Sequence, residues 1–306
     1  MKAKLKGLAT LSVLLGVALA GNFSGSLAIN TRAIYSHRAN SFTLEAAYAG
    51  SLLASEYWGD AYLETAFYPS WNLARNRFDP GLSKLELGYG NGRYAFGLGA
   101  SPEPLSTLRL LRPFSLADDV GDYATGLWGG WAELYPNPAN RLRLALRYQR
   151  GALFGVLHAD GRLSGGDLQA TFICDQETGS AALGGGFSTN LGETVVYSET
   201  WRLFAEPDPW RGGLGINFYL FGGLASIEAA YTGGGWQLAA AYSLQAGEFW
   251  SVDSLLLYEI RVNRLTGSLN LTYTGDPGDL TLGLTSTSDG YAGVIWLPAL
   301  SARVYY

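Results

Sequence analysis

The chain has 306 residues, a formal net charge of −5, and a composition in which 15% of residues are charged and 41 are glycine. The negative net charge argues against a nucleic-acid partner, because nucleic-acid binding needs a basic face. Cys174 is the only cysteine, which excludes a disulfide framework and a zinc cluster of the cysteine type. The glycines, with 19 tyrosines and 9 tryptophans, suit a β protein with tight turns and aromatic belts.

The first twenty residues have the pattern of an export signal. Three lysines form a positive n-region: Lys2, Lys4 and Lys6. An apolar core follows over residues 8–19, and an A-x-A cleavage site lies at 18–20. The pattern predicts a signal peptide over residues 1–20 and a mature domain over 21–306, whose net charge would fall from −5 to −8 without the three lysines. An uncleaved N-terminal anchor is less favoured, because the apolar core is too short for a spanning helix.

Beyond the signal, apolar and polar residues alternate in short segments bounded by turn residues, which is the period of β-strands. In chain order, the predicted strands are 23–35, 41–51, 60–68, 83–90, 93–101, 106–112, 123–135, 141–149, 151–159, 166–175, 179–188, 193–205, 213–221, 223–232, 235–245, 249–263, 264–274, 279–287, 290–297 and 299–306. For the three weakest of these segments, 106–112, 179–188 and 290–297, a loop or a merger with a neighbouring strand is the alternative. The longest irregular stretches are predicted at 69–82, 113–122 and 207–212. No linker or shift in composition divides these segments, so we expect one domain.

The alternation keeps its phase across short turns. The four-residue turn 232–235 sets Tyr231 opposite Trp236, so the apolar rows before and after it lie on one face of an antiparallel hairpin. Other turns are predicted in the same way at 90–93, 263–264 and 274–279. In two predicted strands, 123–135 and 193–205, apolar and polar residues do not alternate consistently.

Charged residues avoid the apolar parity in the clearly phased strands: Glu45, Glu64, Lys84, Glu86, Arg141, Arg143, Arg147, Asp167, Glu228, Asp253, Glu259, Arg261 and Arg303. A lipid-facing arginine at the bilayer midplane would cost about 2–4 kcal/mol, which explains such an exclusion. A soluble antiparallel sheet also alternates, but strands of this length with tight turns and terminal aromatic residues favour a membrane barrel. We therefore expect an all-β fold, a single transmembrane antiparallel up-and-down β-barrel of 16–20 strands, with 18 preferred.

The end of the chain carries a family resemblance. Four residues alternate up to a terminal aromatic side chain: Leu300, Ala302, Val304 and Tyr306. This end resembles the C-terminal assembly signal of porin-like bacterial outer-membrane β-barrel proteins, in which the insertion machinery recognises a last strand that ends in an aromatic residue. The resemblance is to the class and assigns no subfamily. It implies location in the outer membrane after signal-peptide-dependent export, with outer-membrane lipid and the assembly machinery as partners.

The sequence offers little material for catalysis. His37 and His158 are expected to be exposed polar groups, and no serine can be placed against either as a nucleophile. The glycine runs at 88–92 and 184–186 precede no helix, so they are not phosphate loops. The sequence therefore predicts no enzyme, no cofactor and no metal site.

A passive channel is the expected function, because about eighteen strands enclose an aqueous lumen. Small hydrophilic solutes or ions would be the transported partners, and the chain is compatible with a homo-oligomer. A non-conducting structural or anchoring barrel is the alternative, and an outer-membrane enzyme barrel is less favoured.

The pore-lining hypothesis rests on charges that share one side of their strands: Arg141, Arg143, Arg147, Glu45, Glu64 and Glu86. Walls of charged side chains set ion preference in a pore, so an arginine strip would favour anions. Ordinary salt bridges that fill a closed barrel explain the same residues equally well. An acidic loop is expected to fold inward as a constriction, and it contains Asp118, Asp119 and Asp122.

Overall fold

The computed structural model describes residues 22–36, 41–73, 76–79, 81–103, 108, 110–111, 119–120, 123–124, 126–149, 151–163, 165–175, 180–276, 278–289 and 293–305. The predicted signal peptide lies outside these ranges, as do His37, Asp118, Asp122 and Tyr306. No helix among the described residues is long and apolar enough to cross a membrane.

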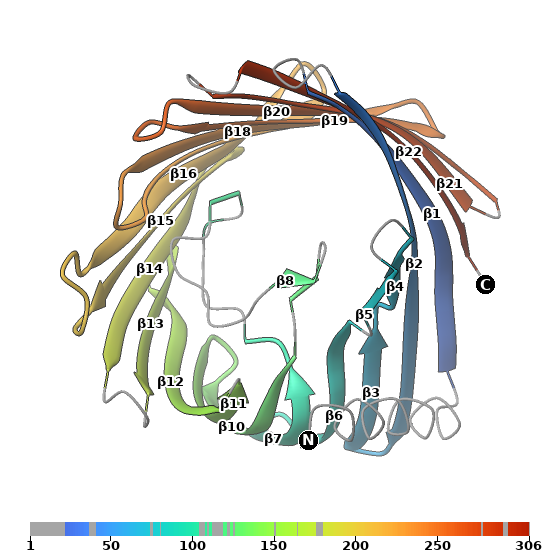
Figure 1. Cartoon of the computed structure of the whole chain (residues 1–306). Coiled ribbons are helices and arrows are strands. Elements are labelled where there is room, and N and C mark those ends of the chain that lie inside the picture. Colours follow the sequence, from blue (N-terminus) through green and yellow to red (C-terminus); the bar gives the residue numbers. More distant parts are fainter. Residues whose placement is uncertain are drawn as a thin grey trace.

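Eighteen antiparallel strands form one closed barrel (Figure 1). They are β1 (Asn22–Ser36), β2 (Ser41–Trp58), β3 (Ala61–Phe67), β6 (Leu82–Gly90), β7 (Tyr94–Ser101), β10 (Leu127–Asn137), β11 (Asn140–Gln149), β12 (Ala152–Leu163), β13 (Gly166–Asp175), β14 (Ala181–Leu191), β15 (Thr194–Leu203), β16 (Trp210–Leu220), β17 (Gly223–Tyr231), β18 (Trp236–Ala246), β19 (Trp250–Glu259), β20 (Arg264–Gly275), β21 (Gly278–Asp289) and β22 (Gly293–Tyr305). Each pairs with its neighbour along the chain, and β1 pairs with β22 to close the ring. The predicted barrel, and the preferred number of strands, are confirmed.

Four short strands are additional to these eighteen, and two of them, β4 and β5, belong to the same sheet. β4 (Ser70–Asn72) pairs with the edge of β2 and with β5 (Arg77–Asp79), within a stretch that was expected to be irregular. β8 (Asp119–Val120) and β9 (Tyr123–Ala124) form a separate two-stranded sheet. Figure 1 places β8 inside the ring of strands.

The two ends of the barrel differ in the length of their connections. Turns of two or three residues join the strands at the end that holds both Asn22 and Tyr305, for example 59–60, 192–193 and 221–222. Most connections at the opposite end are longer, and 102–126 between β7 and β10 is the longest of them. In outer-membrane barrels the short turns face the periplasm and the long loops face outward.

Side chains sort by parity, as the hydrophobic alternation predicts. On β11, the residues that face outward are apolar and exposed: Leu142, Leu144, Leu146 and Tyr148. The residues of the inward parity on β11 include Arg141, Arg143 and Arg147. Alternation of this kind gives a barrel an apolar outer surface and a polar interior.

Strand registers confirm two of the predicted pairings across turns and correct the other two. Tyr231 pairs with Trp236 as expected. Tyr89 lies opposite Phe96 rather than Tyr94, with their rings stacked 5.4 Å apart, and the parity is kept. Tyr273 pairs with Leu280 across 274–279, as predicted. The predicted turn at 263–264 is wrong, because Leu265 pairs with Tyr258 rather than with Val262.

The chain instead turns at residues 260–263, where Asn263 adopts a positive φ of 48°, which asparagine tolerates better than most residues. The other turn is shorter than predicted, because Gly275 pairs with Gly278. A Cβ on Gly278 would lie 2.0 Å from the backbone oxygen of Arg303, so glycine permits this close approach of β21 and β22.

Two of the three weakest predicted strands take the alternative given for them and are not separate barrel strands. Segment 106–112 is not a barrel strand, since its described residues Leu108, Leu110 and Leu111 lie outside any strand. Segments 290–297 and 299–306 merge into β22, which continues through Pro298. The pairing of β22 with β1 skips from Ala299 to Trp296, at the proline that has no N–H to donate.

We predict that a charged substitution on the outer face of the barrel reduces its stability and assembly. Replacing the exposed outward Leu144 or Leu269 with arginine should cost about 2–4 kcal/mol near the midplane and reduce assembly. Thr272→Arg should be accepted, because Thr272 lies on the inward parity, where its hydroxyl is 3.0 Å from that of Thr281. Refolding into lipid vesicles, followed by electrophoresis of unheated samples, measures the folded fraction. Equal responses from the two faces would show that the faces are wrongly assigned.

Candidate functional site in the lumen

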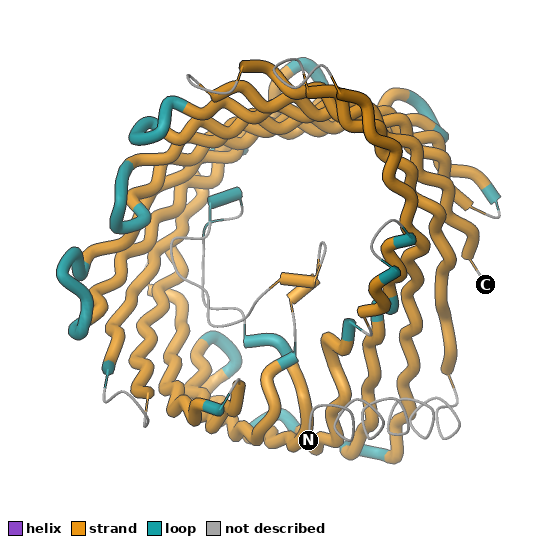
Figure 2. Tube along the Cα trace, viewed as in Figure 1, coloured by secondary structure: helices purple, strands orange, loops and turns teal. Residues whose placement is uncertain are grey.

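The β7–β10 connection enters the barrel and contacts its far wall. The backbone N–H of Leu108 donates to Glu199 Oε2 on β15 at 3.2 Å. The backbone N–H groups of Leu110 and Leu111 donate to Glu228 Oε2 on β17 at 2.9 and 2.7 Å. Two inward carboxylates of the wall therefore hold the backbone of a segment that begins on β7, and Figure 2 shows loop and strand segments inside the ring.

Apolar contacts reinforce this attachment. Leu108 and Leu111 are buried against Tyr197, Ala230 and Ala239, which belong to β15, β17 and β18. The Tyr197 hydroxyl also donates to Glu228 Oε1 at 2.7 Å. Because the carboxylate of Glu228 is almost fully buried, hydrogen bonds from these donors offset its loss of hydration.

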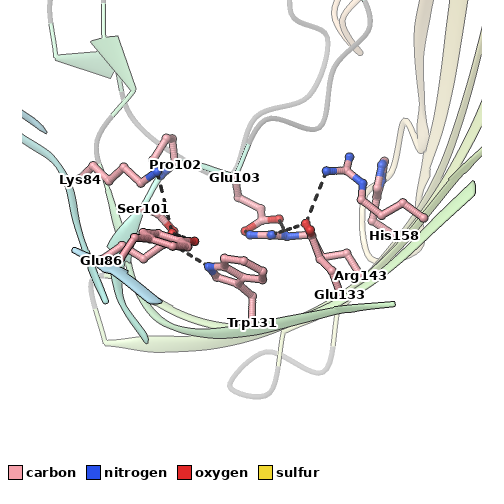
Figure 3. A pocket seen from close by; sticks show the side chains of 11 residues that line it. Lys84, Glu86, Ser101, Pro102, Glu103, Trp131, Glu133, Arg143 and His158 are labelled. Atoms are coloured by element: carbon pink, nitrogen blue, oxygen red, sulfur yellow. Dashed lines mark hydrogen bonds and ion pairs between the residues drawn. The ribbon is translucent and has the colours of Figure 1, made fainter. Parts of the chain in front are cut away.

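A second attachment holds the start of the same connection to β11. Glu103 accepts from Arg143 Nε at 2.7 Å (Figure 3). It also accepts from Arg147 Nε at 2.8 Å. Arg147 also donates to Ser101 Oγ at 2.9 Å. Arg147 is completely buried and the Glu103 side chain is 3% exposed, so this ion pair is shielded from solvent. Burial alone would raise the pKa of the Glu103 carboxyl, but hydrogen bonds and charges from Arg143 and Arg147 hold it below its ordinary value.

Further charges extend the cluster along the inner wall. Glu133 Oε1 on β10 accepts from Arg143 at 2.7 Å and from Arg141 at 3.4 Å. Arg141 also donates to Asp160 Oδ1 at 2.7 Å. The guanidinium of Arg143 lies 4.5 Å above the centre of the Trp131 ring, within range of a cation–π contact.

The network continues across β3 and β6. Glu86 accepts from Tyr62 at 3.0 Å and from the Trp131 indole N–H at 2.7 Å. Lys84 forms an ion pair with Glu64 and lies 3.8 Å from Glu86.

A cavity of about 320 Å³ lies among these groups, and we call it the lumen pocket. Its lining includes Lys84, Glu86, Glu103, Glu133, Arg141 and Arg143, with Tyr62, Trp131 and His158. This arrangement can bind and orient a small polar solute by hydrogen bonds and charge.

The structure brings most of the predicted pore-lining residues into this one network. The three arginines lie on the inward side of β11, and Glu64 and Glu86 reach them through Trp131 and Lys84. Glu45 lies in β2 opposite Arg32 of β1, and its side chain is outside the described residues. Among the predicted constriction residues, Asp119 belongs to β8 inside the ring, whereas Asp118 and Asp122 are not described.

The arginines do not form a bare cationic strip. Each guanidinium contacts at least one carboxylate, and only Arg141 is substantially exposed, at 39% of its side chain. Arg147 is buried beneath Glu103, so a solute in the lumen would not touch it. The geometry matches salt bridging inside the barrel more closely than an open anion-attracting wall, although ion preference itself stays a prediction.

Some important residues escaped prediction. Glu133 lies in a segment in which apolar and polar residues do not alternate consistently, because the inward side of β10 also carries Trp131. Glu103 follows Pro102 after the end of β7. Apolar and polar residues do not alternate there, so the sequence does not indicate whether its side chain points into the barrel or out of it. His158 was expected to be exposed and is buried on β12, 2.6 Å from the Thr171 hydroxyl and 3.2 Å from Asp160. Its inward parity, opposite to that of Leu157, was the available signal.

The three described residues of the predicted assembly signal lie on β22 at the seam of the barrel, and Tyr306 lies outside the described residues. Leu300, Ala302 and Val304 pair with Thr31, Ile29 and Leu27 of β1. Their outward parity gives the seam an apolar outer surface.

No family model and no curated protein matches the chain, but solved structures share its fold. OpdO of Pseudomonas aeruginosa matches with a TM-score of 0.68 and 14% identity, over 94% of this chain and 98% of that one. OccAB4 of Acinetobacter baumannii matches with a TM-score of 0.65 and 8% identity, over 94% and 99%. A mutant porin of Rh. blastica matches with a TM-score of 0.58 and 9% identity, over 93% and 99%. At these identities the likeness establishes the fold of porin-like barrels.

We predict that Glu103 is the carboxylate whose loss is most costly. Glu103→Gln should destabilise the barrel by about 3–5 kcal/mol, because it leaves the buried Arg147 charge without its partner. Glu64→Gln removes a partly exposed partner of Lys84 and should cost about 0–1 kcal/mol. Denaturant unfolding in vesicles compares the two variants, and equal costs would contradict the burial argument.

The stabilisation from Glu103 should also depend on pH. Because its folded-state pKa lies below the ordinary value of 4.5, the contribution is complete above that pH and is lost as pH falls through the folded-state pKa. The stability difference between the wild type and Glu103→Gln, which cannot titrate, should shrink under acid. Unfolding midpoints between pH 7 and pH 3 test this, and a constant difference would contradict it.

Proposed function

We propose that the protein is a channel in a bacterial outer membrane through which small hydrophilic solutes or ions diffuse passively. The observation that carries the proposal is the charged inner wall of an 18-stranded barrel. Barrels of about eight strands are filled by their own side chains, whereas barrels of 16–18 strands leave an aqueous channel. The likeness to a porin supports the proposal without naming a solute.

The β7–β10 connection would be the constriction of this channel. It is attached to β11 through Glu103 and to β15 and β17 through Glu199 and Glu228. The exposed members of the charged network would line the path beside it: Lys84, Glu64, Arg141 and Asp160. Charged walls in a narrow, low-dielectric path act strongly on passing ions.

A non-conducting anchor is the second candidate, because ion pairs that fill the lumen would serve it equally well. An enzyme barrel is less favoured, since His158 contacts Thr171 and Asp160 rather than a serine nucleophile. Conduction separates the channel from both.

We predict discrete conductance steps when the purified, refolded protein is added to a planar lipid bilayer. Each step reports one aqueous path opening across the bilayer. A silent bilayer in which insertion has been verified would reject the channel and favour the anchor.

Export and assembly are part of the proposal. Residues 1–20 would direct export, and the C-terminal segment with its last residue, Tyr306, would direct insertion into the outer membrane. Deleting Tyr306 removes the closing aromatic residue and should leave the protein in the periplasm, where proteases degrade it. Fractionation of cell envelopes measures this, and a normal outer-membrane yield of the shortened chain would count against the assembly role.

A further inference from the structure

The lumen pocket has a balanced set of charges. Three cations and three carboxylates line it: Lys84, Arg141, Arg143, Glu86, Glu103 and Glu133. Figure 3 shows Lys84 and Glu86 on one side, Arg143 and His158 on the other, and Trp131 between them. A volume of about 320 Å³ corresponds to about ten water molecules, so the pocket has room for a small organic solute.

The carboxylates within the lining are already occupied. Glu86 accepts from Tyr62 and Trp131, while Glu103 and Glu133 accept from the arginines of β11. Their side chains are only 3–6% exposed, so they act on a solute mainly through long-range electrostatic interaction rather than by direct contact.

The groups that solvent reaches come as two ion pairs. Lys84 is 30% exposed beside Glu64 at 28%, and Arg141 is 39% exposed beside Asp160 at 34%. Ammonium and guanidinium groups carry several N–H donors, so each cation can bind a solute carboxylate in addition to its protein partner. Glu64 and Asp160 lie beside these two cations at the edge of the pocket rather than in its lining, and their carboxylates can accept from a solute ammonium.

We propose that the lumen pocket is a binding subsite for small zwitterions, which carry one ammonium and one carboxylate group. A simple anion that approaches Lys84 or Arg141 is also repelled by the neighbouring carboxylates. A simple cation that approaches those carboxylates is likewise repelled by Lys84 and Arg141. A zwitterion places each of its charges beside the opposite charge and leaves the network balanced. The transport role of this subsite rests on the proposed channel function.

Three solutes of similar size test the charge requirement: γ-aminobutyrate, butyrate and butylammonium. Single-channel current of the full chain is recorded in a planar bilayer at neutral pH while each solute is titrated. γ-Aminobutyrate should reduce the open-channel current at a concentration at least about fivefold lower than either singly charged solute. Equal reduction by butyrate would overturn the zwitterion preference, and no reduction by any solute would overturn the subsite.

Variants locate the effect. Lys84→Gln leaves two cations and three carboxylates in the lining, so it should weaken the response to γ-aminobutyrate about tenfold and favour butylammonium over butyrate. Arg264→Gln is the matched control, because Arg264 pairs with Glu259 at the β19–β20 turn, outside the pocket lining. If both variants respond alike, or if Lys84→Gln has no effect, the subsite lies elsewhere and the proposal fails.

A binding measurement separates this proposal from the channel function. Saturation-transfer NMR on the detergent-solubilised protein, with the same three solutes, reports binding without requiring conduction. Preferential binding of γ-aminobutyrate that Lys84→Gln removes would support the subsite even in a silent barrel. Salt conductance without preferential binding would keep the channel and reject the subsite.

Discussion

The need to pair every backbone N–H and C=O group governs this structure. In hydrocarbon there is no water to satisfy an unpaired strand edge, so a sheet can span a membrane only by closing on itself. Here the closure is the pairing of β1 with β22, which runs from Ser26 opposite Tyr305 to Ser36 opposite Ile295. Closure gives every strand two neighbours and one outward face. The strict alternation of side chains is a consequence.

Closure also creates an interior that has to be organised. Buried carboxylates on the wall, Glu199 and Glu228, bind backbone N–H groups of the β7–β10 connection. A carboxylate on that connection, Glu103, binds arginines of the wall. The attachments at the two sides of the lumen therefore use the same chemistry in opposite directions. Because buried charge is costly without a partner, each attachment favours one position of the chain.

Period-two alternation made much of the barrel predictable from the sequence. The parity of Leu144 against Arg143 depends on neighbours in the chain, as does the pairing of Tyr231 with Trp236. The alternation is interrupted in strands that carry large aromatic residues on the inward side. Trp131 and Trp201 are apolar, so the pattern alone predicts that they face outward. The lumen contacts were not predictable in this way, because Glu103 and Arg147 are 44 residues apart and no local period connects them.

The pairing of each arginine with a carboxylate changes the effect that the three arginines of β11 would have on ions and solutes in the lumen. A row of unpaired guanidinium groups would hold anions and favour one sign of ion along its whole length. With Glu103, Glu133 and Asp160 interleaved among the three arginines, the field changes sign over a few ångströms and largely cancels at longer range. A solute's net charge then matters less than the spacing of its own charges. Selectivity in such a lumen depends on the arrangement of charge at contact distance, which the closed barrel holds in place.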